Sequence, residues 1–162
     1  PLPSLDEVLT GARRVLVMER VVNPINLGVI ARTAVGLGMD AMVLDDASVD
    51  PLYRRASRVA MGEVFEFPYA RAGRFPAGLE AVGAAGFTLV ALTPADGAES
   101  IDDIAFGPDE RVALVLGSEG PGLTDETMER CDRRVSIPLS GNVDSLNVGA
   151  AAAIACYAIT RA

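Results

Sequence analysis

Short runs rich in Val, Leu, Ile and Phe recur along the chain, separated by longer segments that carry glycine, proline or charged residues. These runs are too short for helices, and turn-forming residues bound most of them, so they predict strands. We expect strands at Arg14–Glu19, Ala41–Leu44, Val64–Phe67, Phe87–Leu92, Arg111–Gly117 and Arg134–Pro138. Because helical segments separate them, the pattern predicts one α/β domain with a parallel sheet.

The segments between the strands predict helices. Asn23–Gly28 reads as a turn that opens a helix to about Gly38, with Ile25, Val29 and Ala34 as inner positions. Thr124 is expected to cap a helix whose first turn is acidic. Further helices are expected at Asp50–Val59, at Pro76–Ala85 and in the alanine-rich segment near the C-terminus, with Leu5–Arg13 as a short lead-in helix or tail.

The last strand and the last helix are joined by a polar segment. Asn142, Ser145 and Asn147 gather where the helix should begin, and Asp144 or Ser145 can serve as its N-cap. We expect Asn147 to lie inside the first helical turn, where asparagine is a poor helix former. A loop with a cap would explain Asp144 and Ser145 but not Asn147, so this segment is a candidate ligand site.

The composition excludes several kinds of chemistry. The chain has no histidine, which removes Ser-His-Asp and Cys-His catalysis and most zinc sites, and we expect no metal. It also has no lysine, so Schiff-base chemistry and a phosphate-loop lysine are excluded. The net charge of −8 argues against broad, nonspecific binding of nucleic acid, although it leaves room for a local basic patch.

The two cysteines and the apolar runs bear on location. Cys131 and Cys156 are far apart, have no metal-binding spacing and read as buried thiols of a cytoplasmic protein. No apolar run is long enough to cross a membrane, and no signal peptide is evident. The chain begins with Pro1 rather than Met, so we expect that it continues a longer protein.

The ends of three predicted strands are the candidate ligand site, because ligands of parallel sheets gather at the carboxyl edge. These ends are Leu92–Thr93, Leu116–Glu119 and Ile137–Leu139, which are mostly small or apolar and suit a flat, uncharged ring. The glycines between Gly117 and Gly122 follow the order G-x-x-G-x-G rather than G-x-G-x-x-G, so a dinucleotide cofactor is not expected.

Three arginines form a candidate contact for a polyanion. Arg54 and Arg58 fall on one face of the helix predicted at Asp50–Val59, with Arg55 beside them. A solvated surface face would explain the same spacing equally well.

Three ordered segments resemble the motifs of SpoU-type (TrmH-like) RNA 2′-O-ribose methyltransferases of the SPOUT superfamily. They are Asn23-Pro-Ile-Asn-Leu-Gly-Val-Ile-Ala-Arg-Thr-Ala34, Leu116-Gly-Ser-Glu-Gly-Pro-Gly-Leu123, and Ile137-Pro-Leu followed by Ser145-Leu-Asn-Val148. The resemblance implies a parallel-sheet SPOUT fold with a deep C-terminal trefoil knot, S-adenosyl-L-methionine as methyl donor, RNA as substrate (ribosomal RNA rather than transfer RNA) and a homodimer.

Domain limits and residue roles follow from the same resemblance. Residues 1–14 would be a lead-in or linker from an N-terminal region, and 15–162 the catalytic domain. Cofactor contacts would come from the three strand ends and Leu146, and a side chain at Gly117 should block the cofactor while leaving the fold intact. The catalytic positions are Asn26, Arg32, Glu119, Ser145 and Asn147; the cofactor positions are Leu92, Thr93, Leu116, Gly117, Ile137, Leu139 and Leu146; the RNA-binding positions are Arg54, Arg55 and Arg58.

Each central residue also has a structural explanation. Asn26 could cap the helix that follows it, Glu119 could accept backbone N–H groups of its own loop, and Arg32 could pair with Asp45 or Asp46. The competing function is a noncatalytic RNA- or nucleotide-binding domain of the same fold. The joint presence of Arg32, Glu119 and Asn147 favours the enzyme.

Overall fold

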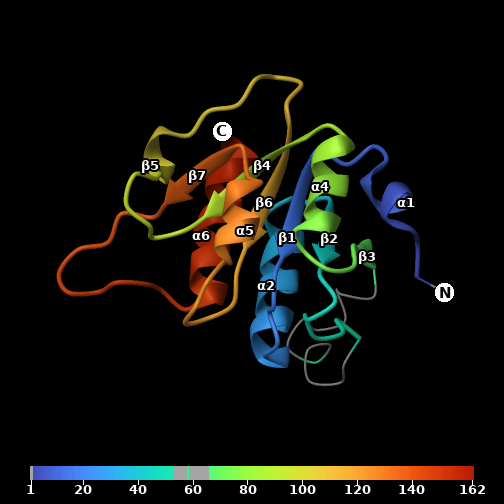
Figure 1. Ribbon diagram of the computed structural model, residues 1–162, viewed down its shortest axis with the longest axis horizontal. Coiled ribbons are helices and arrows are strands. Elements are labelled where there is room, and N and C mark those ends of the chain that lie inside the picture. Colours follow the sequence, from blue (N-terminus) through green and yellow to red (C-terminus); the bar gives the residue numbers. More distant parts are fainter. Residues whose placement is uncertain (1, 53–57, 59–65) are drawn as a thin grey trace.

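The computed structural model describes residues 2–52, 58 and 66–162. Its centre is a seven-stranded sheet in the order β3-β2-β1-β6-β4-β7-β5, and every neighbouring pair of strands is parallel (Figure 1). The prediction of a parallel α/β sheet is therefore confirmed. The strands are β1 (Arg14–Met18), β2 (Ala41–Leu44), β3 (Tyr69–Arg71), β4 (Phe87–Leu92), β5 (Glu99–Ser100), β6 (Arg111–Leu116) and β7 (Arg133–Ser136).

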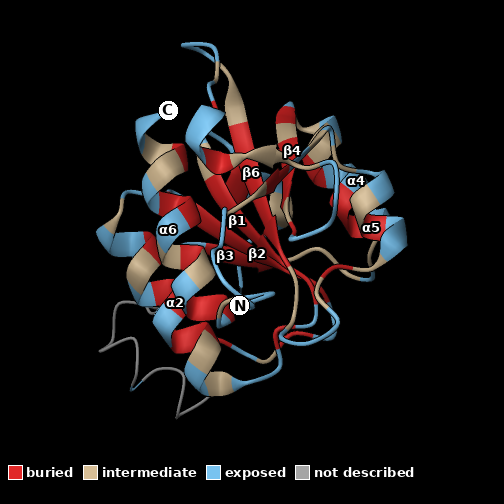
Figure 2. Cartoon of the chain, turned by 90° about the vertical axis from the view of Figure 1, so that its left-hand side faces the viewer, coloured by how far each residue is buried: buried red, intermediate tan, exposed pale blue. Residues whose placement is uncertain are grey.

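Helices cover both faces of this sheet, as Figure 2 shows with the buried strands between two helical layers. On one face α2 (Pro24–Gly36) packs against α6 (Val148–Arg161), and the short 3₁₀ helix η2 (Ile101–Asp103) contacts α6. On the other face lie α1 (Leu5–Leu9), α4 (Ala77–Ala84) and α5 (Asp125–Glu129).

The core is divided between these two layers because side chains alternate along a strand. In β1, Leu16 and Met18 belong to the cluster that includes α2 and α6, whereas Val15 and Val17 belong to the opposite cluster. All four side chains are fully buried, which explains why the strands are continuous apolar runs rather than alternating ones.

Most elements lie where the sequence predicts them. The strands at Ala41–Leu44 and Phe87–Leu92 have the expected bounds, and the other long strands differ from expectation by about two residues or fewer. Asn23 caps α2 and Thr124 caps α5 through side-chain oxygens. Leu5–Leu9 is helical, with a capping box formed by Ser4 and Glu7.

The strand predicted at Val64–Phe67 is misplaced. Within the described residues, Glu66 and Phe67 form a turn and bend, and the strand is Tyr69–Arg71. The parallel register explains the shift, because Tyr69 pairs with Met42 and the carbonyl of Pro68 accepts the N–H of Met42. A short edge strand after a proline has too little pattern for periodicity to locate it. Most of the helix predicted at Asp50–Val59 lies outside the described residues.

Two of the three inner positions predicted for α2 are wrong. Ala34 is buried, but the side chains of Ile25 and Val29 are 42% and 37% exposed. The inner face is formed instead by Leu27, Ile30 and Ala31. The helix is apolar on most of its circumference, so periodicity alone could not choose between the two faces.

The start of α6 is also later than predicted. Neither Asp144 nor Ser145 caps it, since both lie in the connection that precedes the helix. Asn147 is the N-cap, and its Oδ1 accepts hydrogen bonds from the N–H groups of Gly149 (2.8 Å) and Ala150 (3.3 Å). Asn147 therefore does have a local structural role. In the part of the chain that the structure describes, none of the helices combines the length and apolarity needed to span a membrane.

Candidate functional site

A cavity of about 410 Å³ lies where β4, β6 and β7 end. The strand ends enter it as Leu92, Leu116 and Ile137, and the connection before α6 closes another side. All seven positions expected to contact a cofactor line this cavity, together with Ser145 and Glu119. The seven are Leu92, Thr93, Leu116, Gly117, Ile137, Leu139 and Leu146.

The lining of this cavity combines apolar side chains with hydroxyl and carboxylate groups. Glu119, Asp125 and Asp144 contribute carboxylates, whereas no arginine is among the described residues that line it. A phosphate-bearing ligand would meet negative charge without a cation to balance it. The cavity instead suits a ligand with an apolar ring and a positive charge.

Gly117 is required by the loop itself. A Cβ atom on Gly117 would lie 2.4 Å from the carbonyl carbon of Gly122 and 2.4 Å from the nitrogen of Leu123, closer than real Cβ contacts. The loop turns back on itself here, since the N–H of Gly122 donates to the carbonyl of Ser118. The expectation that a side chain at Gly117 would leave the fold intact is therefore wrong.

Three polar side chains from distant parts of the sequence meet beside this cavity. The Nδ2 group of Asn147 donates to Oε1 of Glu119 at 2.6 Å and to Oδ1 of Asn26 at 3.4 Å. Because Oδ1 of Asn147 accepts backbone N–H groups of α6, the orientation of its amide is fixed by partners on both sides. The residues on either side of Asn147, Leu146 and Val148, line the cavity.

This cluster rules out two of the simpler explanations. The α2 helix is capped by Asn23, whose Oδ1 accepts from the N–H groups of Ile25 and Asn26, so Asn26 is not the cap. The only hydrogen bond that the described part of the chain shows for the Glu119 carboxylate comes from Asn147 rather than from the loop around Glu119. Asn26 and Glu119 are thus oriented toward one another through Asn147.

Arg32 and Ser145 do not join this cluster. Ser145 is exposed and lines the cavity. Arg32 is exposed on α2, and among the described residues it forms no ion pair with Asp45 or Asp46. With its spacing of three and seven residues from Val29 and Ile25, Arg32 lies on the exposed apolar face of α2.

Glu19 is a site-supporting residue that the sequence analysis missed. Its carboxylate is 3% exposed and accepts from the N–H of Thr124 at 2.8 Å, the hydroxyl of Thr124 at 3.1 Å and the hydroxyl of Thr127 at 2.5 Å. These bonds fix the start of α5, and hence the end of the loop that carries Glu119. The sequence signal that could have identified Glu19 is a carboxylate directly after an apolar strand.

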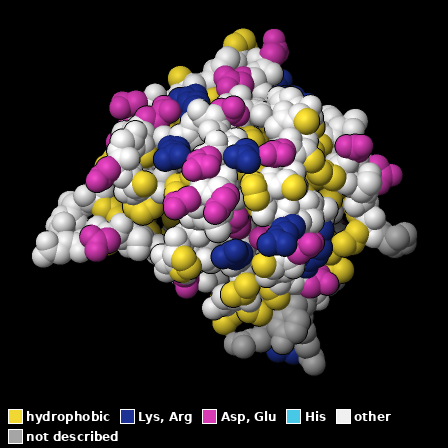
Figure 3. All heavy atoms as spheres, in the orientation of Figure 1, with side chains coloured by type: hydrophobic (Ala, Val, Ile, Leu, Met, Phe, Trp, Pro, Cys, Tyr) yellow, Lys and Arg dark blue, Asp and Glu magenta, His cyan; other side chains and the backbone are white. Residues whose placement is uncertain are grey.

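The predicted RNA-contact arginines cannot be placed together. Arg54 and Arg55 lie outside the described residues, and Arg58 is exposed. On the face shown in Figure 3, acidic and arginine side chains are intermixed over the described surface rather than gathered by sign.

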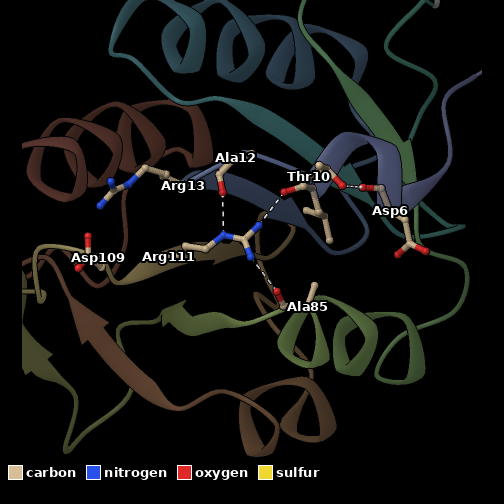
Figure 4. A pocket seen from close by; sticks show the side chains of 9 residues that line it. Asp6, Thr10, Ala12, Arg13, Ala85, Asp109 and Arg111 are labelled. Atoms are coloured by element: carbon tan, nitrogen blue, oxygen red, sulfur yellow. Dashed lines mark hydrogen bonds between the residues drawn. The ribbon is translucent and has the colours of Figure 1, made fainter.

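A larger cavity of about 540 Å³ lies at the opposite, amino edge of the sheet (Figure 4). The guanidinium of Arg111 extends into it but donates to the carbonyls of Leu9, Ala12 and Ala85 at 2.6 to 2.9 Å. It also lies over the ring of Phe87 at 4.1 Å. Arg111 therefore joins α1 and α4 to the sheet, and each of its three guanidinium nitrogens donates to a backbone carbonyl.

Comparisons with known proteins indicate the family that the chain resembles. The sequence model of the SpoU rRNA Methylase family matches residues 13–157. An uncharacterized tRNA/rRNA methyltransferase of Mycobacterium tuberculosis is 48% identical over 99% of this chain and 56% of its own length. The 23S rRNA (guanosine(2553)-2′-O)-methyltransferase RlmP of Bacillus subtilis is 35% identical over 94% of this chain and 60% of its own length.

Solved structures show the same fold. The AdoMet-bound rRNA methyltransferase of Sinorhizobium meliloti superposes with a TM-score of 0.89 at 30% identity, covering 99% of this chain and 61% of that one. The chain thus spans little more than half the length of the relatives named here.

Proposed function

The chain belongs to the SpoU rRNA methylase family, and from this premise we propose that it transfers a methyl group from S-adenosylmethionine to the ribose 2′-hydroxyl of an RNA nucleotide. Ribosomal RNA is the substrate that the named relative RlmP supports. We place its work in the cytoplasm, in keeping with its free cysteines.

One observation carries the proposal. The polar cluster of Asn26, Glu119 and Asn147 stands at the edge of the cavity formed by the ends of β4, β6 and β7. A pocket with apolar walls at the strand ends and a few convergent polar groups is the usual arrangement of a small-molecule site. Both parts are needed for a methyl transfer, one to hold the donor and one to hold the acceptor.

The residues present fit S-adenosylmethionine. The volume of about 410 Å³ lies in the range of small-molecule sites, and the apolar side chains of Leu92, Leu116 and Ile137 suit the adenine ring. The carboxylates of Glu119, Asp125 and Asp144 in the lining complement the positive charge of the cofactor. When bound, the cofactor supplies an electrophilic methyl group on a positively charged sulfur.

In the reaction, the protein positions the ribose and stabilises the negative charge that develops on its 2′-oxygen. Correct placement of two reactants can account for roughly 7–11 kcal/mol of a barrier. We propose that Asn26 and Asn147 fix Glu119, and that Glu119 and Ser145 orient the acceptor nucleotide. Arg32 would bind the adjacent phosphate and stabilise the developing alkoxide, while a phosphate oxygen takes the proton.

We propose that Arg32 acts together with a second copy of the chain. Arg32 is exposed and lies apart from the polar cluster, on the α2 face that carries Ile25 and Val29. The neighbouring helix α6 presents Ile154 and Tyr157, which are 42% and 54% exposed. We propose that these faces of α2 and α6 form a homodimer interface, since adjacent apolar stripes mark association surfaces. Arg32 would then act beside the partner's cavity.

The trefoil knot remains part of the proposal. The connection before α6 lines the cavity, and α6 packs against both α2 and β6, so the C-terminal segment returns deep into the domain. Knots are rare in proteins, and the support here is the likeness to SpoU methyltransferase structures. An experimental structure with an unknotted backbone would contradict this part of the proposal.

RNA affinity is expected to be modest for the chain alone. The net charge of −8 opposes a polyanion, and strong binders make roughly 6–10 phosphate contacts. We propose that Arg54, Arg55 and Arg58 contribute to RNA binding. The Arg54→Glu and Arg58→Glu double variant should weaken RNA binding in a salt titration.

The experiment that tests the function has two steps. The first measures S-adenosylmethionine binding by calorimetry and by the rise in melting temperature. The second maps ribose methylation by mass spectrometry in ribosomal RNA from cells with and without the gene. Loss of one 2′-O-methyl group in the deletion strain supports the enzyme. Binding without any change in methylation would support the noncatalytic domain instead.

A further inference from the structure

A second cavity at the carboxyl edge takes no part in the proposed methyl transfer. Its volume is about 430 Å³, and it lies beyond the ends of β1 and β2. Its lining includes Arg20, Asp46, Arg74, Phe75 and Glu126.

This cavity directly adjoins the cavity at the ends of β4, β6 and β7, which is called the cofactor cavity below. Leu123 and Asp125 line the cofactor cavity, whereas Thr124 and Glu126 line the second one, so the start of α5 separates the two. Arg20 lies shortly before α2, the helix that carries Asn26. A nucleotide strand with its ribose at the polar cluster could therefore place a nearby base in the second cavity.

Arg20 is held in an unusual conformation at the mouth of this cavity. It is the one described residue other than glycine with a positive φ, at 56°. Its N–H donates to both carboxylate oxygens of Asp45 at 3.1 and 3.2 Å. Asp45 is buried and also accepts from the N–H and hydroxyl of Ser48. Such conformations cost free energy and cluster at functional sites, where the surroundings impose them.

The side chains of this cavity that are available to a ligand carry both positive and negative charges. Glu19 and Asp45 are committed to the hydrogen bonds described above, which leaves Arg20, Arg74, Asp46 and Glu126. All four are exposed, and in the described part of the chain neither arginine side chain has a hydrogen bond or an ion pair. Phe75 and Pro76 add a half-buried apolar surface.

This combination favours a base over a phosphate. A phosphate would be attracted to the arginines but repelled by the two carboxylates. Guanine matches both signs, because its O6 and N7 accept from arginine and its N1–H and N2–H groups donate to a carboxylate. Unstacked RNA bases are commonly held by such edge contacts together with an aromatic or guanidinium plane.

We propose that this cavity binds a guanine base of the RNA strand near the ribose that is methylated. The proposal rests on the proposed function for the identity of the ligand. Arg20 and Arg74 would donate to the base, Glu126 or Asp46 would accept from it, and Phe75 would cover one side.

The test compares two short oligouridines by fluorescence anisotropy at low ionic strength, one carrying a single guanosine and the other an adenosine at the same place. The full chain should bind the guanosine oligomer about fivefold or more tightly. Arg20→Gly removes the side chain while suiting the positive φ, so the fold should hold. This variant and Arg74→Ala should lose the preference. Arg13→Ala is the matched control, since Arg13 lines the cavity at the opposite edge.

The Asp46→Asn and Glu126→Gln double variant separates the two ligand classes, because it removes both carboxylates that could accept from the base. A base site predicts that the guanosine preference falls in this variant, whereas a phosphate site predicts equally tighter binding of both oligomers. The second result overturns the proposal, as does equal affinity of the unmodified chain for both oligomers or a preference that survives Arg20→Gly. Methyl transfer to ribosomal RNA is measured on the same preparation. It distinguishes failure of the proposed base site from failure of the proposed methyltransferase function. Transfer without base preference removes only this inference, and preference without transfer removes only the proposed function.

Discussion

The side chain of Asn147 donates a 2.6 Å hydrogen bond to Glu119 while its carbonyl oxygen caps the last helix. One amide thus joins the loop after β6 to the start of α6, and its two ends have different tasks. A substitution that keeps the oxygen and removes the NH₂ group can separate these tasks.

Asn147→Asp is that substitution. An aspartate caps as well as asparagine, so the free energy of unfolding should change little from this source. The new carboxylate would face Glu119 in place of a donor, and the like charges should displace Glu119 and sharply lower methyl transfer. Asn147→Ala is the control, because it loses the cap as well and should cost about 1 kcal/mol of stability. Denaturant unfolding and a single-turnover methylation assay measure the two effects. Full activity in the aspartate variant would contradict the role of the bond.

Much of the fold was predictable because its local signals agree. The apolar runs at Ala41–Leu44 and Phe87–Leu92 are wholly or mostly buried, as expected of parallel strands covered on both faces. Thr124 before Asp125 and Glu126 is a cap signal that the structure uses as expected. The carboxyl-edge rule was enough to bring Leu92, Leu116 and Ile137 to one cavity.

The remaining features depend on contacts between distant segments. Asn147 was expected inside a helical turn, and only the folded chain places Glu119 and Asn26 within reach of its amide. The exposure of Ile25 and Val29 could not be read from α2, since the choice of inner face depends on α6. Glu19 looked like the end of a strand, because its partners Thr124 and Thr127 lie about a hundred residues away.

Gly117→Ala should destabilise the domain even without ligand. The added Cβ would lie 2.4 Å from backbone atoms of Gly122 and Leu123, and a backbone neighbour cannot move aside as a flexible side chain can. We expect a loss of about 1–3 kcal/mol in the free energy of unfolding, measured by urea denaturation. Gly36→Ala is the matched control, with no atom within 4 Å of the new methyl group, and should be neutral or slightly stabilising. Equal stability of the two variants would show that the loop opens readily.

Ile154→Glu should convert a dimer into monomers without harming the domain. Ile154 is 42% exposed in the single chain, so a glutamate there is solvated in the monomer but buried in the proposed interface. Light scattering at micromolar concentration should give the mass of two chains for the parent and one for the variant. Leu2→Glu is the control, since Leu2 is 50% exposed but lies on neither α2 nor α6. A monomeric mass for the parent protein would contradict the proposed dimer.

Alkaline pH should destabilise the fold through its cysteines. Burial raises the pKa of both Cys131 and Cys156 from about 9 to about 12. The folded state therefore holds these protons more tightly than the unfolded state, so their contribution is complete below pH 9 and is lost progressively between about pH 9 and 12. Urea midpoints across this range should fall less steeply for the Cys131→Ala and Cys156→Ala double variant. Parallel slopes in the two proteins would contradict the assignment.

Arg32 gives the sharpest test of the chemistry. It lies away from the cavity of its own chain, so Arg32→Ala should leave the affinity for S-adenosylmethionine within a few-fold of the parent, as measured by calorimetry. Methyl transfer should fall severely, because the substrate phosphate and the developing alkoxide lose their guanidinium partner. Arg32→Lys should not restore the rate, since lysine lacks the planar pair of donors that grips a phosphate. Substantial activity in the lysine variant would show that a positive charge alone is sufficient.

Mixed dimers extend this test to the proposed assembly. An Arg32→Ala chain paired with an Asn147→Asp chain contains one site with both defects and one with neither, if Arg32 acts across the interface. Such a heterodimer should recover up to about half of the parental rate, whereas each homodimer is inactive. If Arg32 acts within its own chain, every site of the heterodimer carries one defect and no activity returns. The recovered rate, measured on heterodimers purified through two different tags, therefore decides which chain Arg32 serves.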